Sequence, residues 1–282
     1  MSVMQIREIE AIDLPAVAAL LKEGFPQRAP AYWDRALSVL ESRSRVEGYP
    51  RYGFLLEVEG KSEGVMLLLS ARVRGSVRSN LSSWYVREAH RKYATFMFQR
   101  TIKTRGGVYL NLSPSKVALP IAEAFGFKPY TAGTLLIDAR QTLSAGSGSK
   151  VGALTANKLA ALPKLEDREL VEHHLAFGCD GLLLQDEQGA MVALWRPKRL
   201  KRLVPAARFI AGDPARLVAA AGPLMRALAR RGVPLALIDA PHQFVPPPGV
   251  QAMPERERRY FKGAQPPAPG DLLETEIALF GP

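Results

Sequence analysis

The 282-residue sequence contains one cysteine, Cys179. A single thiol excludes an internal disulfide and any metal site built from several cysteine ligands. Long apolar runs are also missing, since no stretch approaches the roughly 20 residues of a membrane-spanning helix. The first residues lack the charged-then-apolar pattern of a secretory signal. These absences favour a cytoplasmic protein without a membrane segment, and they predict no metal site.

Acidic residues are scarcer than basic ones, with 27 Asp and Glu against 38 Lys and Arg, so the net charge is +11. This balance suits an anionic ligand, and it would equally suit nucleic acid or an acidic surface. No nucleic-acid recognition motif accompanies the charge. We therefore do not expect nucleic acid as a partner, because the net charge is the only feature that would support it.

The first half of the chain alternates strand and helix signals. Asp13 precedes Pro15 and a run of apolar residues, which predicts a helix capped by Asp13. The turn Glu59-Gly60-Lys61 predicts a hairpin. The expected strands are 5–9, 54–58, 65–69, 81–86, 108–112 and 134–138, and the expected helices are 13–23, 32–42, 95–104 and 117–125. This order predicts an α/β fold with a mixed sheet, which strand 134–138 closes.

A Gly/Ser-rich stretch, Ser144-Ala145-Gly146-Ser147-Gly148-Ser149, has the composition of a flexible linker. It predicts an N-terminal domain at 1–143, a linker at 144–150 and a C-terminal domain at 151–282.

The second half repeats the element order of the first half. The expected helices are 155–162, 167–177 and 214–230, and the expected strands are 181–184, 190–194, 203–210, 233–238 and 274–280. We interpret the chain as two copies of one α/β unit, each a mixed sheet flanked by helices.

The stretch from Leu81 to Tyr130 reads as strand, basic turn, helix, strand and helix. Arg91 and Lys92 lie between the first strand and its helix. The amide N–H groups at a helix N-terminus favour an anion such as a pyrophosphate. The alternative is that both side chains simply solvate a turn.

This stretch resembles the core of the GNAT superfamily, the acyl-CoA-dependent N-acyltransferases. Ala118 to Ala124-Phe125-Gly126-Phe127, after Asn111, is similar to the family's Asn–Ala–Gly-Phe segment. The family's pyrophosphate loop reads Arg/Gln-x-x-Gly-x-Gly/Ala, whereas this chain has Ala94 and Phe96 at the two small positions. Ala94 fits this place if its φ is negative, and Phe96 must point away from the phosphates.

The resemblance implies two tandem acyltransferase-like domains and an acyl-CoA cosubstrate, with acetyl-CoA the expected donor. It further implies a small-molecule or peptide amine as acceptor, and a homodimer is one possible assembly. The residues implied to bind the cosubstrate are Tyr85, Val86, Arg91, Lys92, Tyr93, Ala94, Thr95 and Asn111.

The family often places a Tyr where this chain has Ala122, to protonate the departing thiolate. Replacement candidates are Tyr85, Tyr93, Tyr130 and Ser113, and we choose Ser113 because it follows Asn111 where the strand leaves the sheet. Candidates for a general base are Glu57, Glu59 and His90. His173 and His174 are adjacent on an expected helix and so point apart, which is wrong for joint metal ligation.

The two halves differ at the start of the helix that follows strand 81–86 in the first half and strand 203–210 in the second. In the second half the helix opens with Asp213-Pro214, so the carboxylate of Asp213 would take the free amides and repel a phosphate. The first half has Arg91 and Lys92 there. We therefore expect the cosubstrate in the first half. The competing hypothesis is a non-catalytic sensor that binds acyl-CoA or another anion.

Overall fold

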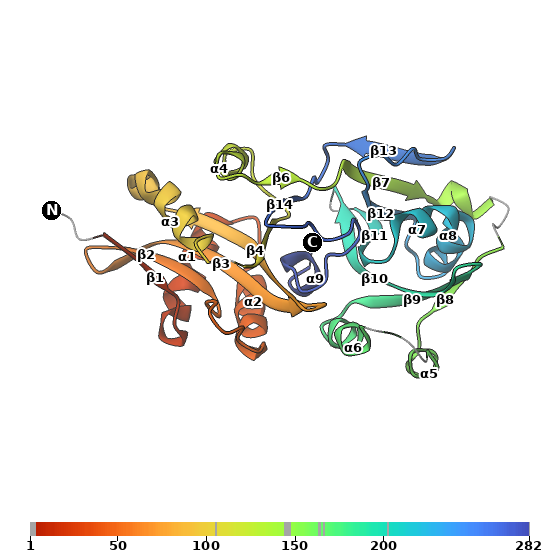
Figure 1. The fold of residues 1–282 in the computed structure, drawn as a ribbon, viewed down its shortest axis with the longest axis horizontal. Coiled ribbons are helices and arrows are strands. Elements are labelled where there is room, and N and C mark those ends of the chain that lie inside the picture. Colours follow the sequence, from red (N-terminus) through yellow and green to blue (C-terminus); the bar gives the residue numbers. More distant parts are fainter. Residues whose placement is uncertain are drawn as a thin grey trace. The chain divides into compact units, whose positions relative to one another are not determined.

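The computed structural model describes residues 4–104, 106–143, 148–162, 165, 167–201 and 203–281. The chain forms two compact units. The first comprises Met1–Lys128 and Tyr260–Pro266, and the second comprises Pro129–Arg259 and Pro267–Pro282. In the described residues each unit contains a mixed, seven-stranded sheet with helices on its faces (Figure 1).

The first unit is built around strands β1 (Met4–Glu8), β2 (Gly53–Val58), β3 (Lys61–Val73), β4 (Ser76–Val86), β5 (Val108–Asn111), β6 (Lys128–Pro129) and β14 (Tyr260–Lys262). Its helices are α1 (Leu14–Gly24), α2 (Pro30–Ser42), α3 (Ala94–Thr101) and α4 (Ala118–Ala124), with short 3-10 helices at Ala11–Asp13 and Glu88–Tyr93. Helices α1 and α2 lie on one face of the sheet and α3 on the other (Figure 1).

The second unit is built around strands β7 (Gly133–Asp138), β8 (Lys150–Ala153), β9 (Asp180–Asp186), β10 (Gly189–Leu200), β11 (Val204–Ala211), β12 (Leu235–Ala240) and β13 (Val250–Pro254). Its helices are α5 (Ala156–Ala160), α6 (Arg168–Ala176), α7 (Pro214–Ala219), α8 (Ala221–Ala229) and α9 (Glu276–Leu279), with a 3-10 helix at Ala139–Leu143. The expected helix 214–230 divides at Ala220, because Pro223 lacks the amide N–H that would continue the ladder.

The two sheets have the same strand order. The first runs β1-β2-β3-β4-β5-β14-β6 and the second β8-β9-β10-β11-β12-β7-β13. In both, the fourth and fifth strands are parallel while the preceding neighbours are antiparallel. This common order confirms the prediction of two similar α/β units, each a mixed sheet flanked by helices.

The sixth place in each sheet is taken by a strand from the other half of the sequence. Strand β7 follows β6 in the chain, yet it pairs with β12 and β13 in the second sheet. Strand β14 follows β13 in the chain, yet it pairs with β5 in the first sheet. The prediction that strand 134–138 closes the first sheet is therefore wrong. Its replacement is Tyr260–Lys262, a strand that sequence analysis did not identify.

Two further local predictions are wrong. The expected strand 274–280 is a turn followed by helix α9. Asp13 does not cap α1 through its side chain. Its carboxylate instead accepts two hydrogen bonds from Arg7, at 2.6 and 2.8 Å, and a third from the backbone of Glu10. Residues 144–147 of the predicted linker lie outside the described residues, so the linker at 144–150 stays a prediction.

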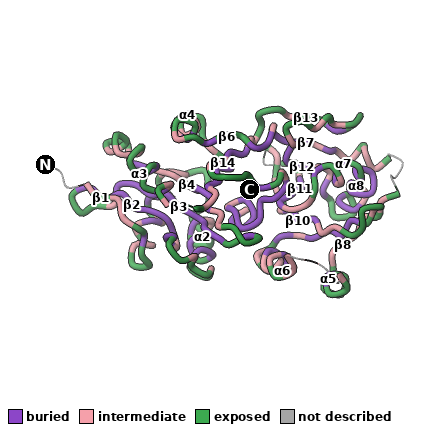
Figure 2. Tube along the Cα trace, viewed as in Figure 1, coloured by how far each residue is buried: buried purple, intermediate pink, exposed green. Residues whose placement is uncertain are grey.

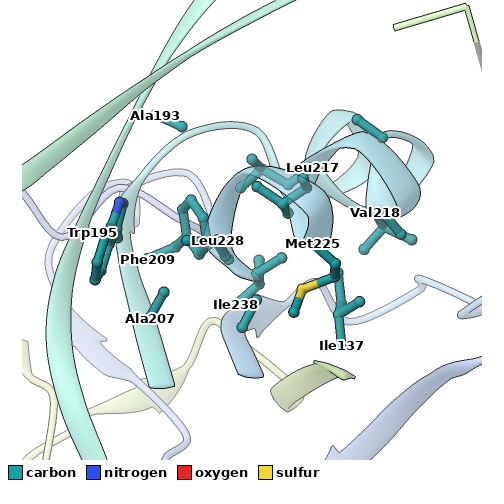
Figure 3. Close-up of a cluster of buried hydrophobic side chains, with 14 of the residues drawn as sticks. Ile137, Ala193, Trp195, Ala207, Phe209, Leu217, Val218, Met225, Leu228 and Ile238 are labelled. Atoms are coloured by element: carbon teal, nitrogen blue, oxygen red, sulfur yellow. The ribbon is translucent and has the colours of Figure 1, made fainter. Parts of the chain in front are cut away.

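Each unit has its own apolar core, visible as the buried strands in Figure 2. In the first unit, Met97 and Phe98 of α3 and Ala122 of α4 pack on the sheet. In the second, Leu228 and Met225 of α8 pack against strand residues that include Trp195, Phe209 and Ile238 (Figure 3).

Because each sheet includes a strand from the other half, we expect both units to unfold in a single transition. Leu224→Ala opens a cavity in the second core, where Leu224 is fully buried, and should cost about 2–5 kcal/mol. In a Trp195→Phe background the remaining tryptophans, Trp33 and Trp84, report on the first unit. Their urea midpoint should fall with the Leu224→Ala change.

The matched control is Leu143→Ala, since Leu143 is 90% exposed and belongs to the second unit. It should leave the midpoint unchanged. An unshifted first-unit midpoint in Leu224→Ala, with the second unit destabilised, would show that the units unfold independently.

Candidate functional site

Strands β4 and β5 of the first unit separate at their carboxyl ends. Their parallel pairing runs from Arg78 opposite Val108 to Leu81 opposite Asn111. Beyond Leu81, β4 continues to Val86 beside β3, while β5 ends at Asn111. We call this place the first divergence. In open α/β sheets the carboxyl ends of parallel strands, where chain directions part, are the usual place for a ligand.

Strand β4 bulges where β5 leaves it. The register with β3 shifts between Val65 and Leu67, and Ser83 on β4 has a φ of 51°. The left-handed conformation costs a residue with a side chain roughly 1–2 kcal/mol. A bulge takes backbone groups out of the ladder and redirects them, and bulges are frequent next to active sites. Sequence analysis missed this bulge, whose signal was the pair Ser82-Ser83 inside an apolar run.

Tyr85 lies just beyond the bulge and faces helix α1. Its hydroxyl donates a hydrogen bond to Glu23 at 2.8 Å. Its ring packs against Gly24 so closely that a Cβ there would lie 2.3 Å from the ring. Burial raises the pKa of Tyr85, and the hydrogen bond to Glu23 raises it further. Tyr85 is thus a neutral, positioned phenol at neutral pH. Val86, by contrast, is buried in the core.

Arg87 connects the end of β4 to helix α1. Its guanidinium donates to both carboxylate oxygens of Glu23, at 2.8 to 3.1 Å, and to Glu63 at 3.3 Å. Its backbone N–H donates to the carbonyl of Glu63, and its own carbonyl accepts from His90. The hydrogen bonds from Arg87 and then Tyr85 lower the pKa of Glu23. Arg87 therefore anchors the start of the basic turn, a role that sequence analysis did not assign.

The basic turn, Glu88–Tyr93, is a 3-10 helix that runs directly into α3. Sequence analysis expected an open loop here. Because glycine is absent, the backbone takes right-handed angles, and Ala94 has a φ of −57°. The negative φ of Ala94 is the condition under which alanine fits the family's glycine position. The amide of Ala94 donates to the carbonyl of Arg91, whereas Tyr93 provides no side-chain cap for the helix that follows.

The structure brings Arg91, Lys92, Tyr93, Ala94 and Thr95 together at the start of α3. Arg91 is exposed and lies 4.0 Å from Glu88, and the ammonium of Lys92 lies 5.1 Å from the centre of the Tyr93 ring. Thr95 is exposed in the first helical turn. Two cations therefore stand at the positive end of a helix dipole, which favours an anion.

Phe96 follows in the same helical turn, and its side chain is exposed.

Asn111 and Ser113 mark the other side of the first divergence. Asn111 is buried and pairs with Leu81 on one side and with Tyr260 of β14 on the other. Ser113 is exposed two residues later. Ala122, at the family's Tyr position, is fully buried in the core. Whether these residues bind a ligand stays a prediction.

The alternative acids and bases occupy different surroundings. Glu57 is held by Arg7 at 2.7 Å, and Glu59 is exposed in the β2–β3 turn. His90 lies 3.8 Å from Glu63 and 6.4 Å from the ring of Tyr93, centre to centre. Tyr130 belongs to the second unit. Of the three proposed bases, only His90 shares the basic turn with Arg91 and Lys92.

In the second unit, α7 begins as predicted. Asp213 is its N-cap, its carboxylate accepts the amide of Arg216 at 3.0 Å, and Pro214 follows. An aspartate cap supplies its own negative charge to the helix start.

Lys198 of β10 is partly buried and donates to Glu257 at 2.5 Å, whereas the neighbouring basic residues Arg199 and Lys201 are exposed. His173 and His174 both approach Glu274, with ring nitrogens 2.8 and 3.3 Å from one carboxylate oxygen. Over the described part of the chain, no group of three His, Cys, Asp or Glu side chains is placed to hold a metal ion. The helices found there are all too short or too polar to span a bilayer.

The Glu23–Arg87 pair predicts a pH dependence. The pKa of Glu23 is lowered from 4.5 in the folded state, so the pair stabilises the fold above pH 4.5 and this contribution is lost as the pH falls through the lowered pKa. Both side chains are more than 40% exposed, which limits the effect to about 1 kcal/mol. Glu23→Gln should unfold more easily than the parent at pH 7 and match it in strong acid.

The control is Glu88→Gln, because Glu88 is 89% exposed and lies 4.0 Å from Arg91. It should follow the parent at every pH. A stability gap for Glu23→Gln that is constant with pH would contradict the ionic contribution.

Comparison with solved structures identifies the fold. A GCN5-related N-acetyltransferase from Anabaena variabilis matches 92% of this chain and 72% of its own, with a TM-score of 0.59 and 9% identity. One from Sphaerobacter thermophilus matches 96% and 98%, with a TM-score of 0.50 and 16% identity.

A GCN5-related glucosamine N-acetyltransferase region of a fungal multi-domain β-N-acetylglucosaminidase matches 93% of this chain, with a TM-score of 0.58 and 14% identity. This chain spans only 38% of that protein's length. No known family profile matches the sequence, and no curated protein matches it. At these identities the similarity defines the fold alone. The chain therefore has the fold of the GCN5-related N-acetyltransferases of the GNAT superfamily.

Proposed function

We propose that the protein is an acyl-CoA-dependent N-acyltransferase whose first unit binds the donor. The observation that carries this proposal is the first divergence, where β4 and β5 part after Leu81 and Asn111 and α3 begins beside Arg91 and Lys92. In the family that this chain resembles, the acyl-thioester arm lies between the parting strands and the pyrophosphate lies at the helix start. An acetyl donor and a cytoplasmic location are part of the proposal.

The charges of the site suit this donor. Arg91 and Lys92 would hold the diphosphate through charge-assisted hydrogen bonds, at the positive end of the α3 dipole. Arg87 is committed to Glu23 and Glu63, so it would position the turn. Tyr85 and Asn111 would border the thioester arm from β4 and β5.

Catalysis in such a site consists mainly of holding an amine against the thioester. The amine nitrogen attacks the thioester carbonyl, the C–S bond breaks, and the thiolate leaves with a proton. A backbone amide released by the bulge at Ser83 would stabilise the oxyanion. Ser113 would pass a proton to the thiolate directly or through water, and His90 is the best-placed base for the amine. The acceptor we propose is a small-molecule or peptide amine.

Two observations favour the sensor alternative. The basic turn is a 3-10 helix in which some amides already donate to the chain, and Ala122 stands where the family has its acid. A sensor would bind acyl-CoA without turnover. An assay of CoA release with acetyl-CoA and a panel of amines separates the two functions.

The donor site predicts that reversing its charges weakens binding. Arg91→Glu with Lys92→Glu should reduce the affinity for CoA by about 1–3 kcal/mol, the scale of charge-assisted hydrogen bonds. Isothermal calorimetry measures this loss. The matched control, Lys61→Glu with Lys103→Glu, makes the same charge change at other exposed positions of the first unit. Equal affinity in the two double variants would refute the site.

The catalytic proposal predicts a specific loss of turnover. Ser113→Ala should lower kcat by about a hundredfold, the usual size of general-acid help, while CoA affinity stays the same. Ser115→Ala is the control, because the hydroxyl of Ser115 accepts the amide of Ala118 at the start of α4. It should reduce stability by about 1 kcal/mol and leave kcat unchanged. A parental kcat in Ser113→Ala would exclude the hydroxyl from proton transfer.

A further inference from the structure

The second unit has a divergence equivalent to the first. Strands β11 and β12 pair in parallel from Ala206 opposite Leu235 to Arg208 opposite Leu237. Strand β11 then continues to Ala211 and bulges against β10 between Leu194 and Trp195. We call this place the second divergence. By topology it is where a thioester arm would lie if the second unit bound a donor in the same way.

Residues 270–280, which we call the closing segment, run along the end of β11. The amide of Leu272 donates to the carbonyl of Ile210 at 2.8 Å, on the strand residue beside the bulge. Gly270 has a φ of 83°, and a Cβ added to it would lie 2.4 Å from the carbonyl oxygen of Gly212. The backbone of β11 therefore already bonds to another segment of the same chain.

The closing segment is anchored by its apolar side chains. Its large apolar residues are nearly all removed from solvent, namely Leu272, Leu273, Ile277, Leu279 and Phe280. Full burial of a side chain of this size is a large favourable term in folding. The sum over five such residues is comparable with the whole stability of an ordinary domain. The segment is thus part of the folded core and does not behave as a mobile lid.

Polar contacts fasten the segment at several points. The amide of Glu274 donates to Nε2 of His174 at 3.1 Å. The guanidinium of Arg196 donates to the carbonyls of Ala278 and Leu279, at 2.7 and 2.9 Å. The hydroxyl of Thr275 donates to the carbonyl of Leu272 at 2.6 Å.

An ion cluster bridges the diverging strands. Arg208 of β11 donates to Asp239 of β12, and both side chains are fully buried. Arg259 lies 3.3 Å from Asp239, and Glu257 lies 3.4 Å from Arg259. A buried ion pair is costly to disturb, since removal of one partner leaves the other charge buried and unpaired. The space between β11 and β12 is therefore spanned by the chain's own charges.

We infer that the closing segment takes, in the second unit, the place that the thioester arm would take in the first, so that the chain has one donor site. Ile210 bonds to Leu272, the ion cluster spans the strands, and Asp213 caps the helix where a diphosphate would bind. The inference rests on the proposed function for its ligand. The position of the closing segment does not depend on it.

Calorimetry with CoA tests the stoichiometry. We expect one CoA per chain, bound more weakly in the Arg91→Glu/Lys92→Glu variant. Two CoA per chain, or one whose affinity is unchanged in that variant, would overturn the inference and leave acyl-CoA binding in place. No binding at all would overturn the proposed function. The position of the closing segment would then be tested by the hydrogen-exchange measurement below.

Hydrogen exchange tests the closing segment without any ligand. The Leu272 amide should exchange at least about a thousandfold more slowly than an unprotected amide, as core amides do. Gly270→Ala should speed its exchange at least about tenfold, because the added Cβ meets the backbone of Gly212. The control is Gly281→Ala, which has a similar φ of 94° but open space around the new Cβ. Unprotected exchange at Leu272 in the parent, or equal rates in both variants, would overturn the inference.

Discussion

The structure depends on the reciprocal exchange of one strand between the two halves of the sequence. Strand β7 completes the second sheet and β14 completes the first. In the first unit this exchange reaches the proposed site, because Tyr260 of β14 pairs with Asn111 at the first divergence. Without β14, strand β5 would expose its backbone N–H and C=O groups along one edge. The second half is therefore required for the first sheet, whether or not it binds a ligand of its own.

The sequence predicted the elements better than their partners. Hydrophobic periodicity and turn residues depend on neighbours a few positions away, so the hairpin at Glu59-Gly60-Lys61, most strands and the repeated element order of the two halves could be predicted. The sheet that receives a strand depends on contacts across more than a hundred residues. Strand 134–138 has the same buried, branched character wherever it pairs, and Tyr260–Lys262 is too short to show a period. The exchange of β7 and β14 between the sheets therefore leaves no pattern in the local sequence from which it could be predicted.

The residues of the candidate site likewise divide into those whose positions the sequence could predict and those whose partners it could not. Arg91, Lys92 and Asp213 could be placed because their role follows from position relative to a helix start. The pairing of Glu23 with Arg87 could not be predicted, since the two residues lie 64 positions apart and neither is unusual in its own segment. The bulge at Ser83 could have been predicted, because two serines interrupt an otherwise apolar strand. The basic turn Glu88–Tyr93 is a 3-10 helix, and the residues at the family's two small positions, Ala94 and Phe96, lie after it in α3.

The two divergences occupy equivalent positions in the two sheets but differ in how their charged side chains are paired. In the first unit Arg91 and Lys92 are exposed cations at the start of α3, which has no side-chain cap, and the favourable partner of this arrangement is an external anion. In the second unit Arg208 is fully buried, and burial lowers its pKa. A buried guanidinium must find its counter-charge inside the chain, and Asp239 provides it.

Once that pair is buried and the closing segment packs over β11, admitting an external ligand would require unpairing the charges and exposing five large apolar side chains. Ligand binding of ordinary affinity, about 8 to 12 kcal/mol, would be largely consumed by that opening, so a ligand at the second divergence is disfavoured.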